Sequence, residues 1–150
     1  MSQIPIPFQY IDHVADTRFI AYGSTLENVF ENAAAAMLFV IADTAEIQPT
    51  AEFEVEIETV DLKNLMVDFL SELLFLFDAE ETVLKEVTVT KIESVFDNGE
   101  EKWTLTAITA GAPIEDVGSI FKTEVKAVTY NHIRVEKMGT GYEAEVVLDL

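Results

Sequence analysis

Two stretches of the chain repeat apolar residues at steps of three and four, the spacing that places side chains on one face of an α-helix. The first spans residues 26–41 and the second spans residues 62–77. Ser24 and Glu27 form a capping box, with a hydroxyl at the N-cap and a glutamate three residues later, which predicts where the first helix begins. Asp61 is expected to cap the second helix in the same way.

Other segments carry the signals of β-strands and tight turns. Strict alternation over residues 52–58 predicts a strand with one buried and one solvent-facing side, and the solvent-facing side carries Glu52, Glu54, Glu56 and Glu58. Further strands are predicted at residues 8–11, 17–22, 83–96, 102–110, 123–137 and 142–150. Hairpin turns are predicted at residues 97–99 and 139–141, and an irregular loop at residues 111–121.

These elements predict the fold class and the domain organisation. Two helices among many hairpin-connected strands are typical of an α+β fold, with both helices packed on one face of a mostly antiparallel sheet. The 150 residues suit a single domain spanning residues 1–150, and 49% of them are hydrophobic, enough to build one core.

Composition excludes several kinds of chemistry. The chain has no cysteine, so disulfides, thiolate catalysis and cysteine-ligated zinc are excluded. The first residues lack the basic and apolar regions of a signal peptide, and no apolar run reaches the 18 or so residues of a membrane span. We therefore expect a cytoplasmic protein without a membrane segment.

The charge balance argues against direct nucleic-acid binding. The chain has 28 acidic and nine basic residues, for a formal charge of −19, and Arg18 and Arg134 are its two arginines. Because nucleic-acid binding depends on neutralising phosphates with lysine and arginine, we expect no direct grip on RNA or DNA. An acidic surface suits a basic partner, a cation or a salt-rich habitat instead.

Acidic residues near both ends of the chain are the candidates for chemistry. Asp12, His13 and Asp16 share one short loop, and carboxylate oxygens suit hard cations such as Mg²⁺, Ca²⁺ or Mn²⁺. Asp149 is predicted to point away from the buried side of the last strand, beside the terminal carboxylate of Leu150. These groups can complete a site begun by Asp16, although sequence spacing does not show that they meet.

Five segments, in order along nearly the whole chain, resemble motifs of the archease family. They are Asp12-His13-Val14-Ala15-Asp16, residues 21–27, residues 65–76, residues 124–130 and Val147-Leu148-Asp149-Leu150. Each motif is short, but the five together in this order are specific.

The resemblance implies a function for the chain. Archeases are accessory factors, not enzymes, in tRNA splicing and RNA repair, and they help the GTP-dependent RtcB-type RNA ligase to become guanylylated and to turn over. The resemblance also implies a divalent-metal site at Asp16 and Asp149, for Ca²⁺, Mg²⁺ or Mn²⁺. Asp12 and the Leu150 carboxylate are further candidate ligands.

Two other residues are candidates for activating the partner, and other functions stay open. The candidates are His13 in the first motif and Lys126 in the fourth. One alternative is a chaperone or specificity modulator of an RNA-modifying methyltransferase. Another is a small metal-dependent hydrolase that uses Asp16, Asp149 and His13, and a third is a purely structural acidic domain.

Overall fold

The structure is a computed structural model that describes residues 6–11 and 16–150. The candidate site residues Asp12 and His13 lie outside the described residues. Asp16, Lys126, Asp149 and Leu150 lie within them.

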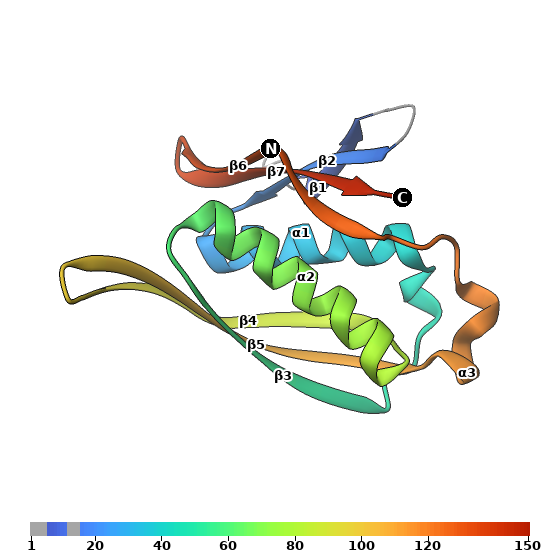
Figure 1. Cartoon of the computed structure of the whole chain (residues 1–150). Coiled ribbons are helices and arrows are strands. Elements are labelled where there is room, and N and C mark those ends of the chain that lie inside the picture. Colours follow the sequence, from blue (N-terminus) through green and yellow to red (C-terminus); the bar gives the residue numbers. More distant parts are fainter. Residues whose placement is uncertain (1–5, 12–15) are drawn as a thin grey trace.

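The described chain forms two antiparallel sheets with helices between them (Figure 1). The first sheet has the order β1-β2-β7-β6, with bounds Phe8–Ile11, Asp16–Gly23, Gly141–Asp149 and Ala127–Met138. The second sheet has the order β3-β5-β4, with bounds Ala51–Thr59, Glu100–Pro113 and Thr82–Asp97. The helices are α1 (Leu26–Ile41), α2 (Leu62–Glu80) and the short α3 (Ile114–Val117), with 3-10 turns at Thr44–Glu46 and Gly118–Ile120. No helix in this part of the chain is long and apolar enough to cross a membrane.

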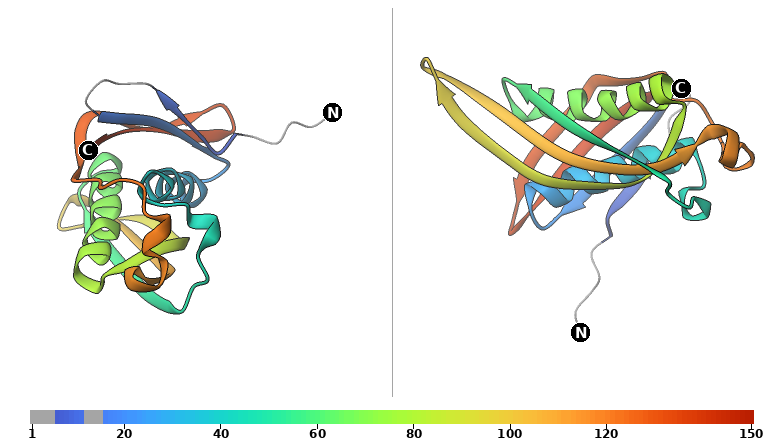
Figure 2. Two further views of the ribbon diagram at one scale, coloured as in Figure 1. Left: turned by 90° about the vertical axis from the view of Figure 1, so that its right-hand side faces the viewer. Right: turned by 90° about the horizontal axis from the view of Figure 1, so that it is seen from below.

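The predicted α+β class and the antiparallel strand pairing are confirmed, but the strands divide into two sheets instead of forming one. Helix α1 contacts both β2 in the first sheet and β4 in the second, so it is covered on two sides (Figure 2). Its fully buried alanines Ala33, Ala34 and Ala36 leave room for strands to approach closely. The apolar spacing identified a buried helix, but it could not show that two separate sheets bury it.

The two long helices begin with side-chain caps, one of them at a different residue from the one predicted. Thr25, not Ser24, is the N-cap of α1, and its side chain accepts a hydrogen bond from the Asn28 backbone N–H at 3.0 Å. Asn28 completes the box, since its Oδ1 accepts from the Ser24 N–H at 3.1 Å. The predicted Asp61 cap of α2 is confirmed, with its Oδ1 accepting from the Asn64 N–H at 2.8 Å.

The hairpins form at the predicted turns. Asn98 and Gly99 connect β4 to β5 with φ of 54° and 79°, the left-handed region that a two-residue hairpin turn requires. The segment after β5 is more ordered than the predicted loop, since it contains α3 and a 3-10 turn. Strand β6 begins at Ala127, later than predicted, because the chain before it pairs elsewhere: the backbone N–H groups of Lys122 and Thr123 donate to the Ile41 carbonyl at the end of α1.

The pairing of β2 with β7 is fixed by buried side chains on the inner face of the first sheet. Phe19 lies opposite Val146 and Ala21 opposite Ala144, and all four are fully buried against the helices. A one-residue slip would turn this apolar set toward solvent, so the register is strongly specified.

A close backbone contact at Gly111 yields a test of the packing. A Cβ at this position would lie 2.2 Å from the Val83 carbonyl oxygen and 2.8 Å from the Leu84 Cα, both backbone atoms. We expect Gly111→Ala to lower the free energy of unfolding by about 1–3 kcal/mol or more, as overpacking does. Gly118→Ala is the control, because a Cβ there meets nothing within 4 Å. Urea unfolding of both variants checks this, and equal stability would contradict the close contact.

Candidate functional site

The β2–β7 pairing places Asp16 directly opposite Asp149. Asp16 is the first residue of β2 and Asp149 the last residue of β7, and the two are register partners. Ala127, the first residue of β6, is registered with Asp149 on its other side. Directly opposed residues of an antiparallel pair have Cβ atoms about 4.5–5.5 Å apart and project from the same face. Two acidic residues that are 133 positions apart in the sequence thus become neighbours at one end of the sheet.

The acidic pair lies on the outer face of the sheet, away from the helices. The alternate β7 residues Ala144, Val146 and Leu148 are fully buried on the inner face, whereas Asp149 is exposed. Asp16 is half-buried. The predicted orientation of Asp149 therefore agrees with the burial pattern. Asp149 is accessible from solvent, whereas the Oδ1 atom of Asp16 is buried.

The other described candidate residues, Leu150 and Lys126, lie at or near this end of the sheet. Leu150 follows Asp149 directly and is half-buried. Lys126 precedes Ala127, has an exposed side chain, and donates its backbone N–H to the Asp149 carbonyl at 2.8 Å. The segment that contains Lys126 is therefore tied to the end of β7.

Both arginines of the chain lie on the same outer face and share Glu145. Arg18 Nη1 lies 3.4 Å from Glu145 Oε2, while Arg134 donates to Glu145 Oε1 at 3.3 Å and to Glu143 Oε2 at 2.7 Å. Burial works to lower the pKa of Arg134, but the hydrogen bonds to Glu143 and Glu145 raise it above its ordinary value. The two guanidinium groups thus connect β2, β7 and β6. In the described ion pairs, their positive charges are paired with glutamates.

A second polar contact fixes β1 beside the acidic pair. The Tyr10 hydroxyl donates to the Ala36 carbonyl of α1 at 2.9 Å, and burial raises the pKa of Tyr10 to about 12. Tyr10, Asp16 and Lys122 border an open hollow of about 300 Å³. The Lys122 ammonium lies 3.6 Å from the centre of the Phe39 ring and 3.6 Å from Asp43 Oδ1.

The register of the acidic pair is compatible with the cation site expected from the sequence. Two opposed carboxylates can share one divalent ion, since oxygen ligands lie within about 2.0–2.6 Å of Mg²⁺ or Ca²⁺. Among residues 6–11 and 16–150, no three histidine, aspartate or glutamate side chains are grouped so that they could hold a metal. Because Ca²⁺ takes about six to eight oxygens, a shared ion would need further ligands, such as Asp12, the Leu150 carboxylate, main-chain carbonyls, water or another molecule.

Sequence reasoning missed the arginine–glutamate network and a pocket beside Lys126. The network depends on cross-strand neighbours, which spacing along one strand does not reveal. The pocket is lined by α2 together with the segment at residues 121–126, part of which was predicted to be strand. Its one local signal was the aromatic residue Phe121 at the end of the predicted loop.

Comparisons with known proteins identify the family. The model of the archease protein family (MTH1598/TM1083) matches residues 8–150. The chain is 44% identical over 150 residues to a protein archease of Methanosarcina barkeri, covering 100% of both chains. It is 32% identical to the protein archease of Methanopyrus kandleri over 145 residues, 97% of this chain and 100% of that one.

Solved structures show the same fold. The solution structure of Methanobacterium thermoautotrophicum protein 1598 superposes with a TM-score of 0.78 at 35% identity, covering 96% of this chain and 99% of that one. The crystal structure of a Thermotoga maritima protein described as an archease and possible chaperone gives a TM-score of 0.53 at 21% identity, covering 100% of both chains. The chain belongs to the archease family.

The acidic pair yields a test of cation binding. We expect Asp16→Asn and Asp149→Asn each to weaken binding of Ca²⁺, Mg²⁺ or Mn²⁺ about tenfold or more, because each removes one charged oxygen ligand. Isothermal titration calorimetry with each metal chloride measures this. Asp116→Asn, an exposed aspartate of α3, is the matched control. Undiminished affinity in either site variant would contradict a shared site. Asp149→Asn and Asp116→Asn, both at exposed positions, should unfold within about 0.5 kcal/mol of the native chain.

Proposed function

We propose that this protein is a non-catalytic accessory factor that activates a GTP-dependent RtcB-type RNA ligase, promoting its guanylylation and turnover in tRNA splicing and RNA repair. The observation that carries the proposal is the register of Asp16 with Asp149 in a chain of the archease family. Both residues match motifs of that family.

The acidic pair serves in this proposal as a divalent-cation site. Asp16 and Asp149 hold the ion, with Asp12 and the Leu150 carboxylate as further candidate ligands. A bound divalent ion would supply positive charge that neutralises the opposed carboxylates and can attract phosphate oxygens. The chain's own contribution is to hold the two carboxylates in one place, since the β2–β7 register fixes their backbones.

The openness of the site supports an accessory role over catalysis by this chain. Enzymes that act on bound substrates usually enclose them and expel water from the reacting atoms. Asp149 is exposed at the end of a strand, and the exposed Lys126 lies next to it in the fold. This end of the sheet is suited to insertion into the active cleft of another protein. Lys126 and His13 are the residues proposed to act on the partner.

Surface charge supports a basic partner. The Glu52, Glu54, Glu56 and Glu58 side chains are exposed along β3, and both arginines are engaged by glutamates. A ligase that holds RNA, GTP and metal ions needs a basic cleft, and opposite charge speeds the encounter of two proteins.

A guanylylation assay tests the proposal. The native chain should accelerate covalent attachment of GMP to an RtcB-type ligase. Asp16→Ala and Asp149→Ala should abolish the acceleration while the proteins stay folded, because both residues lie at strand ends outside the apolar core. Asp116→Ala should accelerate the ligase like the native chain. Full acceleration by either site variant, or none by the native chain, would refute the proposed function.

A further inference from the structure

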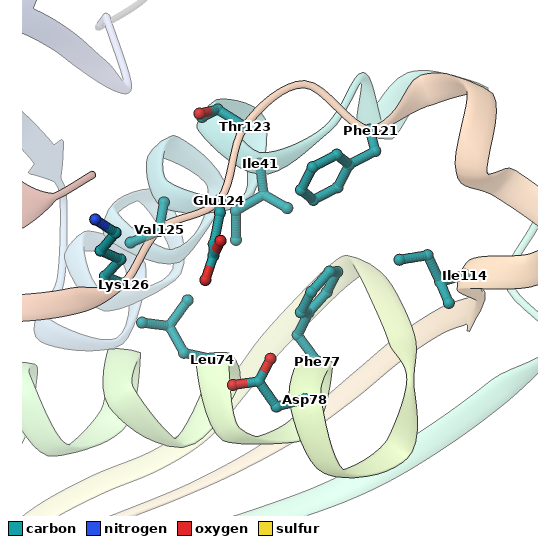
Figure 3. A pocket seen from close by; sticks show the side chains of 10 residues that line it. All are labelled: Ile41, Leu74, Phe77, Asp78, Ile114, Phe121, Thr123, Glu124, Val125 and Lys126. Atoms are coloured by element: carbon teal, nitrogen blue, oxygen red, sulfur yellow. The ribbon is translucent and has the colours of Figure 1, made fainter.

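A pocket of about 270 Å³ opens between α2 and the segment at residues 121–126 (Figure 3). Leu74, Phe77 and Asp78 line it from α2, and Phe121, Glu124 and Lys126 line it from the opposite segment. Its volume lies just below the roughly 300–1,000 Å³ of pockets that hold drug-sized ligands. A single side chain of another protein suits this size.

Two aromatic rings form one part of the pocket. Phe77 and Phe121 stack with their centroids 6.0 Å apart and an interplanar angle of 23°. Phe77 is half-buried and Phe121 is 38% exposed, so their ring surfaces are partly open to solvent. Leu74 and Ile114 extend the apolar surface around them.

Two carboxylates form the polar part. Asp78 and Glu124 are both exposed, and Glu124 extends across toward α2, where Asp78 lies, while the amino group of Lys126 points away from the pocket (Figure 3). Across residues 6–11 and 16–150, neither carboxylate forms a hydrogen bond or an ion pair. Within that part of the chain, these two negative charges beside an apolar hollow have no cationic partner.

We propose that this pocket binds an arginine side chain of a basic protein partner. A guanidinium group can stack flat on aromatic rings and donate hydrogen bonds to carboxylates at the same time, and its aliphatic stem is apolar. Phe77 and Phe121 provide the rings, and Asp78 and Glu124 provide the acceptors. A lysine ammonium lacks the planar stacking surface, and a bare metal ion gains nothing from the apolar lining.

A backbone hydrogen bond connects the pocket to the acidic pair Asp16 and Asp149. Lys126 lines the pocket and its N–H donates to the Asp149 carbonyl at 2.8 Å. An arginine bound here would anchor the partner beside Asp16 and Asp149. The identity of that partner rests on the proposed function, whereas the pocket's preference for arginine does not.

An NMR titration with N-acetyl-arginine methylamide tests the preference. Backbone amide shifts should concentrate at residues 74–78 and 121–126, with a dissociation constant on the order of millimolar, as for a small ligand. The Asp78→Asn/Glu124→Gln double variant should weaken binding about fivefold or more, and Asp116→Asn should not. The citrulline analogue has the same shape without the charge, and the native chain should bind it at least fivefold more weakly. Equal binding of citrulline, or shifts elsewhere on the molecule, would overturn the proposal.

The same double variant separates this proposal from the proposed function. It should raise the dissociation constant for the RtcB-type ligase about fivefold or more and leave cation binding unchanged. Native ligase affinity in the double variant would overturn the anchoring role. If the native chain fails to activate the ligase but binds the arginine probe at this pocket, the proposed function falls and the arginine site stands.

Discussion

The antiparallel pairing of β2 with β7 is the constraint on which the position of the acidic pair Asp16 and Asp149 depends. It joins strands from opposite ends of the chain, and its register is set by inner-face residues such as Phe19 and Val146 that are buried against the helices. Because strand side chains alternate between faces, the buried inner face also determines which residues project outward. The opposition of Asp16 and Asp149 is therefore a consequence of core packing, and it needs no stabilising contact between the two carboxylates.

The layered arrangement explains how the rest of the chain holds the β2–β7 pair in place. Helix α1 packs between the two sheets, so the inner faces of both sheets share one apolar core (Figure 1). On the outer face, Arg18 and Arg134 both contact Glu145 and connect β2, β7 and β6. The first sheet is thus held by the apolar core on its inner face and by ion pairs on its outer face. The segment before β6 lines the pocket and leads to the end of this sheet.

The sequence predicted the local features well and the long-range ones poorly. Helix spacing, the Asp61 cap and the Asn98-Gly99 turn depend on neighbours in sequence, and the structure confirms them. The division into two sheets depends on which strands pair, which alternation does not specify. Asp16 and Asp149 were candidates from the acidic residues near both chain ends as well as from family motifs, but nothing in their spacing showed that they are opposite. The pocket was not predicted because Asp78 and Glu124 are far apart in the sequence and line one pocket only in the folded chain.

We predict that Asp16 and Asp149 act as one site because the β2–β7 register opposes them. A double-mutant cycle of divalent-cation affinity, with Asp16→Asn, Asp149→Asn and the double variant, measures whether they do. If both carboxylates ligate the same ion, we expect a coupling energy well above the roughly 0.3–0.5 kcal/mol within which independent sites add. The affinity lost in the double variant should then differ from the sum of the two single losses by more than that limit. Losses that add within that limit would show that the two aspartates act separately and do not form one site.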